Sequence, residues 1–123
     1  MAEDHRFPKS LHVLSSRSFG KILREGGTAA ASTLVVAALP RSHTGRTEPT
    51  RIGITIPQRT GNAVTRNRWK RLIREAFRHS KEQMPVGYDL IVRPKKGAEA
   101  NYQCIMDELP RVVRRAAHRS RSH

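Results

Sequence analysis

Hydrophobic residues recur at helical spacing in the middle of this 123-residue chain. Positions i, i+3, i+4, i+7 and i+8 are all apolar in one run, which consists of Trp69, Leu72, Ile73, Ala76 and Phe77. That spacing predicts an amphipathic helix from about Gly61 to Lys81 that buries one stripe of side chains. We expect Trp69 and Phe77 to lie in the core.

Other stretches carry the pattern of β-strands. Residues 33–39, 51–56 and 88–93 are rich in β-branched and aliphatic side chains, and each stretch is followed directly by a proline. The stretch 51–56 alternates isoleucine with glycine and threonine, which predicts a strand with one buried face. The small residues of 28–32 predict a further short strand.

Two more helices flank these strands. A serine before residue 18 can cap a helix over residues 18–25 that ends at Gly26-Gly27. The last helix begins near Asn101, a suitable N-cap. Pro110 lies inside its apolar pattern, which predicts a kink or two joined helices.

The order of elements is helix, two or three strands, basic helix, strand, helix, with no internal repeat and no linker. This order predicts one α+β domain over residues 1–123, with helices packed against a sheet. We expect the apolar residues of 7–14 to dock on the domain, and residues 1–6 and 119–123 to be disordered tails.

The charge of the chain is strongly positive. Lys and Arg number 24 against 10 Asp and Glu, which gives a net charge of +14 and a pI near 11.5. This imbalance favours nucleic acid as the partner, with an anionic membrane surface second. No stretch approaches the roughly 18 consecutive apolar residues of a membrane span, so we expect no membrane partner. The N-terminus has no apolar signal region.

The basic residues gather on the polar side of the central helix. Eight Lys or Arg residues lie between Arg59 and Lys81, against one acid, Glu75. Like charges at i,i+4 destabilise a helix mildly, so the run is either an ordinary solvated face or a surface completed by a polyanion. The charge of the whole chain favours the second interpretation. Six residues form this polar side and its shoulders: Arg66, Asn67, Arg68, Lys70, Arg71 and Arg74.

No catalytic constellation is present. The chain holds no D-x-D, H-E-x-x-H or G-x-S-x-G pattern, and its six histidines show no paired ligand spacing. We therefore expect no catalytic residue and no metal site built by the protein. The single cysteine, Cys104, is expected to be a small buried hydrophobe in a reducing compartment. A metal-dependent protein nuclease, with Glu25, Glu75 and Asp89 converging in space, is the alternative class.

The context of the basic helix favours RNA over DNA. A DNA-reading helix-turn-helix needs a second helix just before the recognition helix, but strands precede this one. Arginine outnumbers lysine on the helix, and its planar fork suits the dense phosphates of structured RNA. We expect RNA as the partner, and no DNA.

The same helix carries a recognisable motif. The run 66–75 (RNRWKRLIRE), behind 61–64 (GNAV), resembles the signature of the bacterial ribonuclease P protein subunit. The likeness extends to residues 7–9 (FPK) and to the strands 51–56 and 88–93, and it covers nearly the whole chain in order.

The resemblance implies a partner role in a ribozyme. In that family the RNA subunit cleaves precursor tRNA to make the mature 5′ end, while the small basic protein binds this RNA, contacts the 5′ leader and helps to retain Mg²⁺. The implied fold is a two-layer α-β-β-β-α-β-α sandwich with a left-handed β-α-β crossover around the basic helix. The implied assembly is a 1:1 ribonucleoprotein with a monomeric protein, in the bacterial cytoplasm.

The resemblance also assigns residues by position. The ribozyme RNA would contact Arg66, Asn67, Arg68, Lys70, Arg71 and Arg74. The leader would lie in a cleft between the first helix and the sheet, over Phe19, with Arg59 and Arg93 at its phosphates. Plain core packing is the alternative for Phe19. Leu23 and Ala37 stand where the family often has aromatic residues. A ribosome-associated or RNA-chaperone module with the same basic face is the alternative function.

Overall fold

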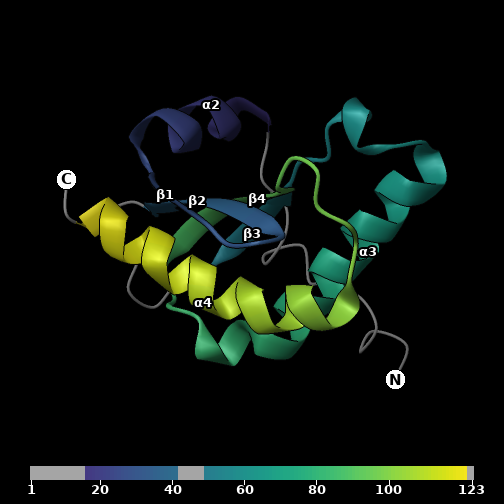
Figure 1. Cartoon of the computed structure of the whole chain (residues 1–123). Coiled ribbons are helices and arrows are strands. Elements are labelled where there is room, and N and C mark those ends of the chain that lie inside the picture. The colour runs from purple at the N-terminus through teal and green to yellow at the C-terminus, as the bar shows by residue number, and fades with distance from the viewer. Residues whose placement is uncertain (1–15, 42–48, 122–123) are drawn as a thin grey trace, which may run out of the picture.

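The computed structural model of the chain describes residues 16–41 and 49–121. The arm expected over residues 7–14 and the tail expected over residues 1–6 lie outside the described residues. The elements follow one another as α2 (Ser16–Glu25), β1 (Gly27–Ala30), β2 (Leu34–Pro40), β3 (Arg51–Ile54), the short 3-10 turn η3 (Gln58–Thr60), α3 (Ala63–Ser80), the 3-10 turn η4 (Lys81–Gln83), β4 (Tyr88–Pro94) and α4 (Tyr102–Arg121) (Figure 1).

The four strands form one mixed sheet in the order β1-β2-β4-β3. The β1–β2 and β2–β4 pairs are antiparallel, whereas β3 and β4 are parallel and are joined through α3. The predicted α+β class and the predicted order of elements are confirmed. The left-handed sense of the β3–α3–β4 crossover stays a prediction.

An ion pair fixes the register of the parallel strands. Arg51 and Asp89 are paired Cα partners across β3 and β4. The Arg51 Nε lies 2.8 Å from Asp89 Oδ1 and its Nη2 lies 2.9 Å from Oδ2, a bidentate geometry. A bidentate pair of this kind is specific to one register, because a slip of the strand would separate the fork from its carboxylate.

The sheet separates two hydrophobic clusters. The large cluster lies between the sheet and the helices α3 and α4, and it includes Trp69 and Phe77, each 1% exposed. The small cluster lies under α2 on the opposite face, where Ile22 packs with Ala37 and Ile91. Figure 1 shows this arrangement, with α2 on one side of the sheet and the two long helices on the other. The predicted core positions of Trp69 and Phe77 are confirmed.

The C-terminal helix departs from the predictions in two respects. It is one helix with Pro110 inside it, so the alternative of two joined helices is wrong. Its neighbours Leu109 and Val112 are almost fully buried, and this packing offsets the roughly 3 kcal/mol that an interior proline costs. The helix also continues to Arg121, so the expected tail is wrong for residues 119–121, while residues 122–123 lie outside the described part.

Close packing against β1 explains why the helix continues. A Cβ atom at Gly27 would lie 2.3 Å from both the Ala116 carbonyl oxygen and the Ser120 amide nitrogen. Glycine therefore allows the start of β1 to approach the backbone of α4, and this contact holds the last turns in place. The expectation for Cys104 is also corrected, because its side chain is only half-buried and the adjacent Ile105 takes the core position.

Candidate nucleic-acid interface

The basic helix α3 begins at a defined cap. The Asn62 side chain accepts a hydrogen bond from the Thr65 amide at 2.9 Å, which satisfies one free N–H of the first turn. Gly61 precedes it with φ 154° and ψ −167°, a conformation almost restricted to glycine, and a Cβ there would lie 2.9 Å from the Thr65 side chain. The residues Gly61 and Asn62 therefore set the position from which the helix projects its side chains.

Four cations on α3 have no partner within the described protein. Arg68, Arg71 and Arg74 are exposed and Lys70 is half-buried, and none of their side chains makes a hydrogen bond or ion pair with a residue in the described ranges. Asn67 is exposed beside them. Because unpaired cations crowded on one helix repel each other, this face is stabilised when phosphates lie against it.

The remaining basic residues of α3 are already engaged. The Arg66 Nε donates to the Gly61 carbonyl at 3.1 Å, which folds this side chain back over the start of the helix. At the other end of the helix, Glu75 Oε1 pairs with Arg78 Nη2 at 2.8 Å and lies 3.1 Å from His79 Nε2. The unpaired positive charge of α3 therefore lies between Arg68 and Arg74, and Arg78 does not belong to it.

This basic surface lies at one edge of the sheet. Lys70 and Arg74 line a small hollow of about 150 Å³ together with Ile52 and Ile54 of β3. Strand β3 is the last in the sheet order, so the hollow adjoins its outer edge. A ligand on α3 would also contact this edge of the sheet.

The residues expected at the leader do not all meet in one place. Phe19 is half-buried and packs on the Ile22, Ala37 and Ile91 cluster under α2. Arg93 lies two residues after Ile91 along β4, and residues at this spacing share one face of a strand. Arg93 therefore lies on the face of the sheet that α2 covers, and it is half-buried. Phe19 thus has a packing role and remains partly exposed on the face of the sheet that carries Arg93.

Arg59 lines a separate cavity at the ends of the parallel strands. This cavity has a volume of about 410 Å³ and lies between η3 and the loop that follows β4. Because β3 and β4 run in the same direction, the segments that leave their carboxyl ends lie side by side. Lys95 and Lys96 line the same cavity, so the structure brings these two neighbouring lysines to Arg59, which lies far from them in the sequence.

Lys95 and Lys96 were not among the predicted site residues. Their sequence signal was the basic loop after a strand, which by itself is typical of any solvated turn. Only the parallel pairing of β3 with β4 places this loop beside Arg59.

The acidic residues of the nuclease alternative do not converge. Glu75 is held by Arg78 and His79, and Asp89 by Arg51. Within residues 16–41 and 49–121, no three His, Cys, Asp or Glu side chains are grouped so that they could hold a metal ion. None of the helices in those ranges has the length and apolar character needed to span a bilayer.

Comparison with known proteins identifies relatives across almost the whole chain. The family model described as Ribonuclease P matches residues 7–117. The ribonuclease P protein component of Desulforapulum autotrophicum is 33% identical over 112 residues, which is 90% of this chain and 92% of that protein.

Solved structures agree with the sequence comparison. The Staphylococcus aureus RNase P protein superimposes with a TM-score of 0.74 at 28% identity, over 88% of this chain and 96% of that one. The RNase P protein of Thermotoga maritima gives a TM-score of 0.74 at 27% identity, over 85% of this chain and 96% of that one.

Proposed function

The chain belongs to the ribonuclease P protein family, and we propose that it is the protein subunit that binds the catalytic RNA and the 5′ leader of precursor tRNA. Membership of this family connects the protein with tRNA processing in a ribonucleoprotein. The proposal adds the division of labour between RNA and protein: the RNA carries out endonucleolytic cleavage, and the protein supplies contacts.

The observation that carries this proposal is the set of unpaired cations on α3. Arg68, Lys70, Arg71 and Arg74 lie on one helix and have no carboxylate partner in the described part of the chain. Arginine forks bind phosphate oxygens through two parallel N–H donors, so a rigid helix that presents several of them fits a folded RNA backbone. Arg66 and Asn67 complete the surface at the start of the helix.

The leader is assigned to the α2 face of the sheet and the adjoining cavity. Phe19 offers part of a ring for stacking on a base, and Arg93 on the same face offers a cation for phosphate. Arg59, with Lys95 and Lys96, would extend this track toward the ends of the parallel strands. Leu23, which is 52% exposed on α2, adds apolar surface in place of an aromatic ring.

Catalysis itself is assigned to the RNA. Among the described residues no three His, Cys, Asp or Glu side chains are grouped to hold a metal ion, and we assign the Mg²⁺ mainly to the RNA of the holoenzyme. The protein would lower the Mg²⁺ requirement by neutralising phosphate repulsion between the ribozyme and its substrate.

We assign the protein to the bacterial cytoplasm, as a monomer in a 1:1 complex.

Reconstitution tests the proposal. The protein should stimulate cleavage of precursor tRNA by a ribonuclease P RNA at low Mg²⁺, and it should produce no cleavage without that RNA. A ribosome-associated module or RNA chaperone would bind RNA without this stimulation, and a protein nuclease would cleave without the ribozyme.

A matched pair of variants on α3 tests the surface. Arg71→Gln removes an unpaired charge, whereas Arg78→Gln removes an equal charge that Glu75 already neutralises. The salt slope is the steepness with which the logarithm of the binding constant falls as the logarithm of the salt concentration rises. We expect Arg71→Gln to lower this slope for binding to the ribozyme RNA by about one, and Arg78→Gln to leave it nearly unchanged. Equal slopes for the two variants would contradict the assignment to α3.

A further inference from the structure

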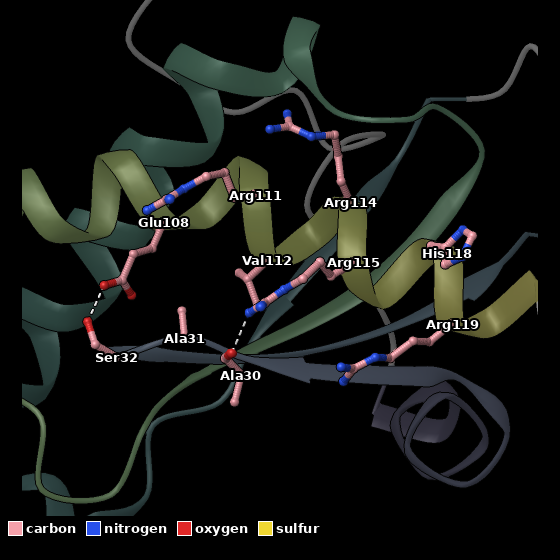
Figure 2. Close-up of a pocket in the computed structure, with 10 residues that line it drawn as sticks. All are labelled: Ala30, Ala31, Ser32, Glu108, Arg111, Val112, Arg114, Arg115, His118 and Arg119. Atoms are coloured by element: carbon pink, nitrogen blue, oxygen red, sulfur yellow. Dashed lines mark hydrogen bonds between the residues drawn. The ribbon is translucent and has the colours of Figure 1, made fainter.

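A second basic groove lies at the opposite edge of the sheet. It has a volume of about 880 Å³ and is formed between α4 and the segment 30–32, which contains the last residue of β1 and the start of the turn after it (Figure 2). Strand β1 is the first in the sheet order and β3 the last, so this groove and the hollow beside α3 lie at the two ends of the sheet. One straight RNA segment on α3 would not reach it by following that helix.

Three arginines of α4 line the groove at intervals of four residues: Arg111, Arg115 and Arg119. At this spacing they lie on one side of the helix and rise by about 6 Å at each step. All three are exposed. Arg114 also lines the groove, but its Nη1 donates to the Gln83 carbonyl at 3.1 Å, so it is directed toward η4.

The edge strand holds two of these arginines in place. Arg115 Nη2 donates to the Ala30 carbonyl at 2.5 Å, and Arg119 Nη1 donates to the Thr28 carbonyl at 2.7 Å. These contacts cover the outward carbonyls of β1, which has a strand partner only on its β2 side within the described sheet. Each guanidinium has five N–H donors, so four remain for a ligand after one contact to β1.

The one carboxylate among the groove residues is already occupied. The Glu108 side chain accepts hydrogen bonds from the Ser32 hydroxyl, from the Thr33 amide at 2.9 Å and from the Thr33 hydroxyl at 2.6 Å. Glu108 is only 8% exposed, and Arg111 lies one turn further along the helix. Its negative charge is therefore directed toward the β1–β2 turn, and the open part of the groove is positive.

We propose that this groove is a second RNA-binding surface, which holds the phosphate backbone of an RNA segment different from the one on α3. The inference rests on the proposed function, because it extends the RNA contacts of the same ribonucleoprotein to the other edge of the sheet. Arg111, Arg115 and Arg119 bind successive phosphates, and β1 keeps the last two side chains preorganised. The segment belongs either to the ribozyme RNA or to precursor tRNA.

The competing explanation is that Arg115 and Arg119 only cover the edge of β1. That role predicts lower stability when they are replaced, with no change in RNA binding. It also predicts that Arg111→Gln leaves RNA binding unchanged, because within the described chain the Arg111 side chain donates a hydrogen bond only to the Asp107 carbonyl of its own helix, from Nε at 3.3 Å. Arg111→Gln therefore separates the two roles without disturbing β1.

The experiment measures binding of the full chain as a function of salt. In one arm, the dissociation constant for a ribonuclease P RNA is measured for the wild type, for Arg111→Gln, and for Arg111→Gln with Arg115→Gln and Arg119→Gln. In the other arm, each protein is assembled with saturating ribozyme RNA, and the dissociation constant of this holoenzyme for precursor tRNA is measured. Lys21→Gln, which removes one exposed charge from α2, is the control.

We expect Arg111→Gln to lower the salt slope by about one in one of the two arms, and the triple variant by about two to three, with binding weakened on the order of tenfold or more. The arm that changes identifies the RNA. Thermal melting checks that the triple variant is folded. If the triple variant is not folded, the single variant Arg111→Gln decides between RNA binding and a role limited to covering the edge of β1.

Slopes equal to that of Lys21→Gln in both arms would overturn the groove as an RNA-binding surface. This failure is distinct from a failure of the proposed function. In that case the wild type itself would neither bind the ribozyme RNA selectively nor stimulate cleavage.

Discussion

The arginines of this protein differ in role according to what each guanidinium already contacts. Arg51 is paired with Asp89, and Arg78 with Glu75. Arg115 bonds the carbonyl of Ala30 at the edge of the sheet. Such arginines contribute to the structure first and to a ligand second. Those without a partner in the described protein, foremost Arg68, Arg71 and Arg74, have their full set of donors available for phosphate.

The environment of Glu108 lowers the pKa of its carboxyl group. Burial acts to raise the pKa of Glu108, but hydrogen bonds from Ser32 and Thr33, together with the charge of Arg111, outweigh burial and hold it below the ordinary value of 4.5. A lowered pKa in the folded state means that the ionised form stabilises the fold. This contribution is present above pH 4.5 and is lost as the pH falls through the lowered value.

We therefore expect Glu108→Gln to lower the free energy of unfolding at pH 7 by about 1–3 kcal/mol, because the Thr33 donors lose a charged acceptor. Thermal melts from pH 7 to pH 3 should show a steeper loss of stability on the acid side for the wild type than for the variant. Parallel curves for the two proteins would contradict the role assigned to this carboxylate.

At the scale of elements, the sequence predicted the positions of helices and strands more completely than it predicted contacts between single side chains. The strand patterns of 33–39, 51–56 and 88–93 correspond to β2, β3 and β4 within two residues at each end, and the predicted N-cap Asn101 accepts a hydrogen bond from the Cys104 amide. Local propensity and periodicity determine these features. The continuity of α4 through Pro110 depends on packing against the sheet, so propensity alone could not decide between one kinked helix and two joined helices.

Two glycines provide a matched test of how β1 packs on α4. Gly27→Ala places a Cβ 2.3 Å from backbone atoms of α4, which cannot move aside as a flexible side chain can. Gly20→Ala in α2 meets only the mobile end of Arg24 at 3.2 Å.

We expect Gly27→Ala to destabilise the protein by about 1–3 kcal/mol or more, because the strand must move away from the helix. Gly20→Ala should be neutral or stabilising by up to about 1 kcal/mol, because alanine favours a helix. Urea unfolding of both variants measures the difference, and similar midpoints would show that β1 and α4 are not held at this distance.

For the whole molecule, the dominant feature is a positive charge that the fold divides between two edges of one sheet. The net charge is +14, and basic residues gather beside β3 and beside β1. Self-repulsion of this size weakens the compact state until anions bind.

We expect sulfate to raise the melting temperature of the free protein more than chloride at equal ionic strength. A bound anion at 100 times its dissociation constant adds about 2.7 kcal/mol. Sulfate also stabilises proteins by exclusion from their surface, so a variant is needed to separate the two effects. The double variant Arg71→Gln with Arg74→Gln should lose part of the sulfate effect, and an equal gain in both proteins would leave only the exclusion effect.

The sequence by itself determined the elements, the α+β class, the basic face of the central helix and the family. Those properties depend on local periodicity, on net charge and on one continuous run of residues. Tertiary structure alone decided which cations meet. Parallel pairing of β3 with β4 brings Lys95 and Lys96 to Arg59, and the approach of β1 to α4 directs Arg115 and Arg119 along a groove. These groupings join residues that are distant along the chain, and no local pattern encodes the distance between them.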